Sequence, residues 1–294
     1  MIESYSPKTS PISHPKFTLL IPSWNNLDYL KLCIRSIREH SAFEHQIVLH
    51  LNGGADGSRE WAKQEGLTFT FSSENVGICW AMNAAAGLAK TDYIVYLNDD
   101  MYVLPDWDRP LWEEIQRIGH RYFFLSATLI EPRETGNSCV IAPGEYGSSI
   151  DSFQEKKLLA NYRQVEKADW NGATWPPNVV HRDLWRLIGG YSIEFSPGMS
   201  SDPDFSMKLW QAGVRYFKGL GNSRVYHFQA KSTGKVEKND GNTQFLRKWG
   251  MTQSTFNQYY LKRGTPWDGP LKDPEMTAGL KRKIQKSRWK LRFK

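Results

Sequence analysis

Four short apolar runs, separated by segments with helical spacing, dominate the N-terminal third of the chain. The runs cover residues 17–21, 46–51, 67–71 and 93–97. Between the first two runs, apolar residues recur at positions 27, 30, 34 and 37, which places them on one face of a helix. Residues 56–65 and 76–90 are the next two predicted helices. The pattern therefore predicts strands and helices in alternation.

The apolar runs are nearly continuous, as is typical of strands that are buried on both faces. Strands of this kind, joined by helices, predict an α/β fold with a mostly parallel sheet flanked by helices. In open sheets of this type, ligands bind outside the carboxyl ends of the strands. Three polar segments fall at those ends, at residues 23–25, 52–54 and 98–100. We therefore expect these segments to form one site.

After residue 105 the pattern is less regular. Helical spacing occurs at 107–119, 153–163, 202–212, 243–249 and 254–262, and strand-like segments occur at 122–130, 214–217 and 224–228. Residues 1–16, which are rich in Ser and Pro, are expected to be a flexible leader. Because no linker is recognisable before residue 263, we expect one compact domain over residues 17–262, followed by a basic C-terminal tail over residues 263–294.

That tail carries the net charge of the chain. The 294 residues include 38 Lys and Arg against 31 Asp and Glu, a formal net charge of +7. Residues 281–294 hold eight of the basic side chains and no acidic one, so the rest of the chain is nearly neutral. Interleaved apolar residues, among them Trp289 and Phe293, make an anionic membrane surface the predicted partner of the tail. A solvated, disordered terminus is the alternative, and no nucleic-acid partner is expected.

The cysteines and the apolar runs indicate the compartment. Cys33, Cys79 and Cys139 form no Cys-x-x-Cys pair, which argues against a disulfide framework or a zinc site. No apolar run approaches the ~18 residues that cross a bilayer. The predicted location is therefore the cytoplasm, with the tail as a peripheral attachment to the inner face of the cell membrane.

An acidic cluster, Asn98-Asp99-Asp100, directly follows the fourth apolar run. Two carboxylates at a strand end are costly unless they are hydrated, paired or bound to a cation. The local residues leave two interpretations open: a turn with solvated aspartates, and a divalent-cation site that binds a diphosphate.

Further motifs accompany this cluster in a fixed order. They are the segments 19–25, 52–58, 75–77 and 105–107 with Asn83 between them, and in the second half the segments 189–195, 202–205 and 225–227. Together they resemble the family 2 glycosyltransferases over roughly residues 16–230. The resemblance implies a GT-A fold, which is Rossmann-like, with residues 17–105 as the nucleotide-sugar-binding half and residues 106–262 as the acceptor half.

The resemblance also implies a reaction. It is the metal-dependent, inverting transfer of a sugar, of the hexosyltransferase type, from a nucleoside diphosphate of the UDP or GDP type to a hydroxyl of a glycan or lipid-linked acceptor. The implied pathway is the synthesis of a surface polysaccharide, a lipopolysaccharide or a glycoprotein glycan. Such a transfer needs a cation for the departing diphosphate and a base for the acceptor proton.

Residue roles follow from the matched motifs. Asp100 and His227 are the implied ligands of Mn²⁺ or Mg²⁺. Asp202 is the implied general base, at a helix N-terminus that is expected to lower its pKa, and Asp204 is the second candidate. The implied nucleotide-sugar site comprises Pro22, Ser23, Trp24, Asn52, Asn75, Gly77, Asn83, Asn98 and Asp99. The implied acceptor site comprises Trp170, Trp175, Gly190 and Ser201.

Some positions depart from the family pattern. Leu51 stands where an Asp usually accepts a base N–H, so the carbonyl oxygen of Asn52 is expected to replace it. Asn98, Met82 and Ser201 are also unusual, which leaves open a non-catalytic nucleotide-sugar-binding homologue as the second function. A nucleotidyltransferase is less consistent with the sequence, because the turn after the first apolar run lacks a Gly-rich loop with Arg or Lys.

Overall fold

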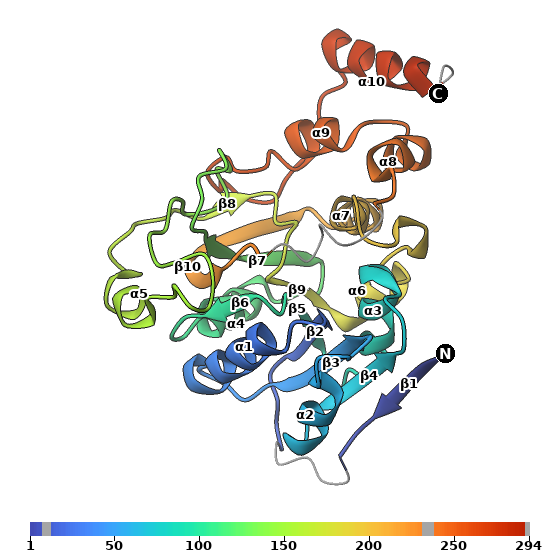
Figure 1. Cartoon of the computed structure of the whole chain (residues 1–294). Helices are drawn as coiled ribbons and strands as arrows, with labels where there is room; N and C mark the ends of the chain where they lie inside the picture. The colour runs from blue at the N-terminus through green and yellow to red at the C-terminus, as the bar shows by residue number, and fades with distance from the viewer. Residues whose placement is uncertain (8–12, 231–237, 292–294) are drawn as a thin grey trace.

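The computed structural model describes residues 1–7, 13–230 and 238–291 and shows a large mixed sheet with helices on both faces (Figure 1). Its centre is a row of four parallel neighbours. In spatial order these are β4 (Thr68–Ser72), β3 (Gln46–Asn52), β2 (Thr18–Trp24) and β5 (Tyr93–Tyr96). They correspond to the four apolar runs of the sequence.

The sheet continues beyond β5 through β9 (Asn178–His181), β7 (Phe123–Ile130), β10 (Tyr216–His227) and β6 (Met101–Val103). Because β9 is antiparallel to both β5 and β7, β7 runs in the direction of β5, and β10 is parallel to β7. Most strands therefore share one direction, and their carboxyl ends lie along one edge of the sheet. The predicted α/β fold with a mostly parallel sheet flanked by helices is confirmed.

Successive strand residues alternate between two apolar cores. In β2, Leu19 and Ile21 pack in one core while Leu20 packs in the other. The first core receives α1 (Leu27–His40), α2 (Ser58–Gln64) and α4 (Asp108–Ile118). The second receives α3 (Gly77–Ala86), α6 (Arg182–Leu187) and α7 (Ser201–Gln211). This burial on both faces explains why the strands read as continuous apolar runs.

The remaining described elements surround this centre. They are α5 (Glu155–Asn161), a 3₁₀ turn (Ile193–Phe195), α8 (Gly241–Trp249), α9 (Gln253–Thr255), a π-helical turn (Phe256–Tyr260), α10 (Ala278–Lys290), and the strands β1 (Ile2–Tyr5) and β8 (Trp170–Asn171). Figure 1 shows α8, α9 and α10 at the end of the molecule opposite α2 and β1. None of the helices in the described part of the chain is long and apolar enough to cross a membrane.

Three expectations change with the structure. The flexible leader is wrong for residues 2–5, which form β1 and pair antiparallel with β4, while residues 8–12 lie outside the described part. The segments 214–217 and 224–228 were expected as two strands, but most of both lies in one strand, β10, whose pairing with β7 shifts register between Leu220 and Arg224. The tail contains α10, whose Leu280 and Ile284 are buried, so it is packed on the body rather than loose.

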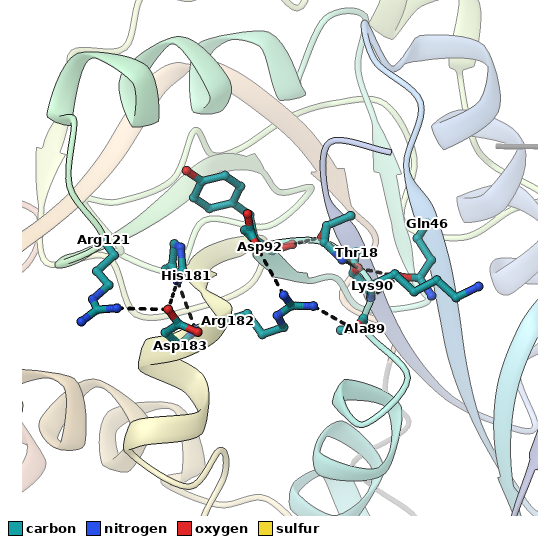
Figure 2. A network of polar contacts seen from close by, with 11 residues as sticks. Thr18, Gln46, Ala89, Lys90, Asp92, Arg121, His181, Arg182 and Asp183 are labelled. Atoms are coloured by element: carbon teal, nitrogen blue, oxygen red, sulfur yellow. Dashed lines mark hydrogen bonds and ion pairs between the residues drawn. The ribbon is translucent and has the colours of Figure 1, made fainter. Parts of the chain in front are cut away.

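A polar network closes the amino ends of β2 and β5 (Figure 2). Gln46 Oε1 accepts hydrogen bonds from Thr18 Oγ1 at 2.7 Å and from the Lys90 amide at 2.8 Å. Arg182, the first residue of α6, pairs with Asp92 at 3.1 Å just before β5. These contacts join both halves of the domain at the edge of the sheet that lies away from the polar segments.

Candidate active site

The carboxyl ends of β2, β3, β5 and β10 surround a cavity of about 440 Å³. The three polar segments meet there, as expected. Of the implied site residues, the cavity is lined by Pro22, Ser23, Trp24, Asn52, Asn75, Gly77, Asn98, Asp99, Asp100, Ser201, Asp202 and His227. Tyr96, Ile78, the 197–199 loop, Gln229 and Ala230 complete the described lining.

Asp100 and His227 face each other at the end of the sheet. His227 is the last residue of β10 and pairs in register with Met101 of β6, which directly follows Asp100. Its Nε2 lies 3.5 Å from Asp100 Oδ2, and its Nδ1 lies 2.9 Å from Glu131 Oε1. Burial opposes the charged ring, but the pairing with Asp100 and Glu131 raises the pKa of His227 to about 9.

Glu131 was missed by the sequence analysis. It directly follows β7, so the rule that selected the other polar strand ends also applies to it. Its signal was hidden because residues 131–149 look like an irregular loop rich in Gly, Pro and Ser. In the structure Glu131 is buried and orients the ring of His227 toward Asp100.

The donor set fits a divalent cation. Two atoms that bind one ion at ~2.1 Å lie roughly 3 to 4 Å apart, which matches the separation of His227 Nε2 and Asp100 Oδ2. The cavity also brings in the carboxylates of Asp99 and Asp202, while no Lys or Arg is found among its described lining residues. A cation would satisfy this excess of negative charge and replace the proton of His227.

Asp99 lies next to Asp100 in the cavity lining, and its charge is affected by this neighbour. Its burial and the neighbouring Asp100 carboxylate raise its pKa to about 7, whereas the nearby polar side chains of Ser23 and Asn26 oppose the rise. The two aspartates therefore resist being charged together, and a cation at Asp100 would relieve that repulsion.

Asp202 projects into the cavity from the first turn of α7. Its Oδ1 accepts a hydrogen bond from the Tyr191 hydroxyl at 2.9 Å. Burial raises the pKa of Asp202 to about 6, and the Tyr191 bond opposes that rise. The expectation of a lowered pKa at the helix N-terminus is wrong, because loss of hydration outweighs the favourable end of the helix.

Asp204 does not reach the cavity. Its side chain is fully buried, and Oδ1 lies 2.8 Å from Trp249 Nε1 and 2.9 Å from Lys248 Nζ. Both partners come from α8, so Asp204 joins α7 to α8. The structure therefore leaves Asp202 as the candidate base.

On the nucleotide side, amide oxygens hold the start of α3. Asn52 Oδ1 accepts from the Val76 amide at 3.0 Å, and Asn75 Oδ1 accepts from the Gly77 amide at 2.9 Å. The expectation that the Asn52 oxygen is available to a base is therefore wrong. Gly77 has φ +78°, and a Cβ there would lie 2.7 Å from Pro197 Cα, so its lack of a side chain permits this contact.

Asn83 and Gly190 lie behind the cavity instead of lining it. The Asn83 side chain donates to the Tyr191 carbonyl at 2.7 Å and accepts from the Tyr191 amide at 2.8 Å. A Cβ on Gly190 would lie 2.3 Å from Asn83 Oδ1. Asn83 therefore positions Tyr191, which holds Asp202, and Gly190 leaves room for the Asn83 side chain.

Trp170 and Trp175 are also outside the cavity lining. Trp170 is buried, its Nε1 donates to Thr128 at 2.9 Å, and its ring covers Gly219, where a Cβ would clash. Trp175 is stacked under the Arg263 guanidinium at 4.1 Å. The structure places Trp170 in the core, so we do not include it in the acceptor site.

The sequence matches a known family over half its length. The family described as Glycosyl transferase family 2 matches residues 18–167. The putative glycosyltransferase EpsH of Bacillus subtilis is 26% identical over 97 residues, which is 32% of this chain and 28% of that protein. Hyaluronan synthase of Pasteurella multocida is 22% identical over 270 residues, 83% of this chain and 24% of that protein. The chain thus spans less than a third of the length of these curated relatives.

Solved structures show the same fold. TarS 1-349 of S. aureus superposes with a TM-score of 0.53 at 14% identity, covering 72% of this chain and 60% of that one. The same region of TarS in complex with UDP gives a TM-score of 0.52. At this identity the similarity shows the fold alone, and the GT-A fold expected from the sequence is confirmed.

Proposed function

Because the chain belongs to glycosyl transferase family 2, we propose that it moves a sugar from a nucleoside diphosphate to an acceptor hydroxyl with inversion, aided by Mn²⁺ or Mg²⁺. The observation that carries this proposal is the charge of the cavity. Asp99, Asp100 and Asp202 line it without a described Lys or Arg. A diphosphate would be repelled from such a cavity unless a divalent cation entered with it.

Asp100 and His227 would hold the cation. When bound, it would neutralise the diphosphate and stabilise the charge that develops on the leaving group. Glu131 lies behind His227 and fixes the orientation of its ring, so Nε2 would already face the cation.

Asp202 would take the acceptor proton. Its Oδ1 is held by Tyr191, which leaves Oδ2 for the acceptor hydroxyl. The acceptor oxygen would bond to the anomeric carbon as the bond between that carbon and the diphosphate oxygen breaks, and the proton would pass to Asp202. With a pKa of about 6, the carboxylate is ionised at neutral pH and is a stronger base than an ordinary Asp.

The substrates are proposed at the level of class. The UDP complex of TarS favours a uridine donor, and the names of the relatives favour a glycan acceptor. A glycan or lipid-linked acceptor of surface polysaccharide, lipopolysaccharide or glycoprotein synthesis is consistent with both. The alternative is a non-catalytic homologue that binds the nucleotide sugar only.

We also propose that α10 attaches the protein to an anionic membrane surface. Leu280 and Ile284 face the body, and Arg288 Nε donates to the Gly250 carbonyl at 2.9 Å. Lys281, Arg282 and Lys286 are exposed, and Trp289 is 59% exposed. A packed helix that presents cations and an aromatic ring suits a lipid headgroup region better than a loose tail does.

A thermal-shift screen tests the donor site. Nucleoside diphosphates and nucleotide sugars are added to the full chain with and without Mn²⁺. We expect the melting temperature to rise with a nucleoside diphosphate and Mn²⁺ together, since binding to the folded state alone stabilises it. No shift with any nucleotide, with or without the ion, would contradict the proposal.

A further inference from the structure

Asn52 lies beside an aromatic ring on the wall of the cavity. It is the last residue of β3, and its neighbours in register are Trp24 at the end of β2 and Ser72 at the end of β4. Trp24 and Asn52 both line the cavity, and Asn52 is only 5% exposed. An aromatic ring beside an amide is a suitable pair for a planar base, with stacking on one residue and edge contact to the other.

The orientation of the Asn52 amide is fixed by a backbone donor. Oδ1 accepts from the Val76 N–H at 3.0 Å and lies 3.0 Å from Ser72 Oγ. A flipped amide would turn its own N–H groups toward the Val76 N–H, so two donors would face each other. The oxygen must therefore point into the protein.

Ser72 and Val76, which contact the Asn52 oxygen, are themselves held in place by further contacts. Ser72 Oγ is also bonded to the Glu74 carbonyl at 2.7 Å and to His50 Nε2 at 3.2 Å. Burial lowers the pKa of His50 to about 4, so this ring is neutral. Val76 is held from the other side, because the next residue, Gly77, packs directly against Pro197.

Only Nδ2 of Asn52 is then left for a ligand. No described residue accepts a hydrogen bond from Nδ2, and Nδ2 is not among the buried side-chain atoms that lack a partner. Because Asn52 lines the cavity, we infer that it donates an N–H to a base instead of accepting one. The base would therefore turn a carbonyl oxygen or an unprotonated ring nitrogen toward Asn52.

This inference rests on the proposed nucleotide-sugar site and specifies its selectivity. An acidic residue at such a position selects the N3–H of uracil. A donor instead gives its N–H to the O2 or O4 of uracil, and it can also donate to the N3 of cytosine, which has no hydrogen. We therefore expect the wild type to tolerate cytosine in place of uracil.

The test is calorimetric titration of UDP and CDP into the full chain with Mn²⁺. We expect the two affinities of the wild type to lie within about tenfold of one another, or to favour CDP. Asn52→Asp keeps an oxygen for Val76 and replaces the donor by an acceptor, so it is expected to shift the UDP-to-CDP preference toward UDP by at least about tenfold. Asn75→Asp is the matched control, because it adds the same charge to the same cavity while its oxygen still bonds the Gly77 amide. It should weaken both nucleotides without changing their ratio.

Two results would overturn the inference. One is a wild type that prefers UDP by more than tenfold and loses that preference in Asn52→Ala, since Asn52 would then accept the N3–H. The other is an unchanged ratio in a folded Asn52→Asp. A wild type that binds neither nucleotide would contradict the proposed function itself and, with it, this inference. If UDP or CDP still binds with Mn²⁺ but the base selectivity is not as expected, this inference is contradicted and the proposed function is not.

Discussion

The Tyr191 hydroxyl donates a hydrogen bond to Asp202 Oδ1 across 2.9 Å, and this contact fixes the candidate base at the edge of the cavity. Tyr191 is itself held through its backbone by Asn83 of α3 and stacks on Phe205 of α7 at 4.7 Å. The candidate base is therefore positioned by contacts that begin at both α3 and α7.

Removing this hydroxyl should move the pH dependence of transfer. A base must be deprotonated, so the wild-type rate is expected to fall as the pH drops through about 6, the pKa of Asp202. The Tyr191 bond lowers that pKa, so Tyr191→Phe should raise it and shift the acid limb to higher pH. The variant keeps the ring that stacks on Phe205. Profiles of kcat against pH would show the shift, and coincident acid limbs would contradict it.

Loss of Asp100 should abolish the effect of the metal on donor binding. Asp100→Ala removes one of the two proposed ligands, and we expect the donor affinity in Mn²⁺ to fall by roughly tenfold or more. Chelation of the metal should have the same effect on the wild type. Asp106→Ala is the control, because among the described residues the Asp106 side chain pairs with Arg109 and Arg163 in exposed ion pairs. Equal Mn²⁺ dependence in Asp100→Ala and the wild type would exclude this metal site.

The contact between Gly77 and Pro197 should be sensitive to one methyl group. Gly77→Ala combines a positive φ with a Cβ that would lie 2.7 Å from Pro197 Cα. We expect the free energy of unfolding to fall by ~2–4 kcal/mol and donor binding to weaken. Gly66→Ala is the matched control, with φ +63° and nothing within 4 Å of the added carbon. It should cost only the backbone strain, ~1 kcal/mol. Equal losses in denaturant unfolding would show that the contact is unimportant.

Neutralising the exposed face of α10 should weaken attachment to anionic vesicles. Lys281, Arg282 and Lys286 can be changed to Gln while Lys283 and Arg288, which bond the body, are kept. At ~1 kcal/mol for each basic residue, we expect binding to fall by roughly a hundredfold. Gln at Lys63, Lys90 and Lys156 is the control for overall charge. If vesicle co-sedimentation changes equally in both variants, α10 is not the attachment surface.

Much of the first half of the fold follows directly from the sequence. The helix predicted from the apolar residues at 27, 30, 34 and 37 is α1, and the four apolar runs correspond to β2, β3, β4 and β5. β6 and β9 were missed because their strand structure depends on pairing with distant partners rather than on a pattern of their own. β10 looked like two strands because Gly219 and Gly221 interrupt its apolar pattern, whereas its pairing with β7 keeps it continuous.

The candidate site could also be predicted from the sequence only in part. Position at a strand end was enough to bring Asp100, Asn52 and Trp24 to one cavity. What could not be predicted were contacts made by distant segments: Glu131 against His227, and Val76 against the Asn52 oxygen. The pKa of Asp202 was misjudged for the same reason, since its burial depends on the loop and helices packed around it.

The most direct test of the account compares donor binding and sugar transfer in Asp202→Asn, with Mn²⁺ present. The amide keeps the size of the side chain but cannot accept the proton. We expect donor affinity to stay within a few-fold of the wild type, while transfer falls by roughly 10²–10⁴. Asp204→Asn, which alters a carboxylate two residues away and outside the cavity, should lower stability and leave transfer by the folded protein largely intact. Unchanged turnover in Asp202→Asn would contradict the assignment of the base and the mechanism built on it.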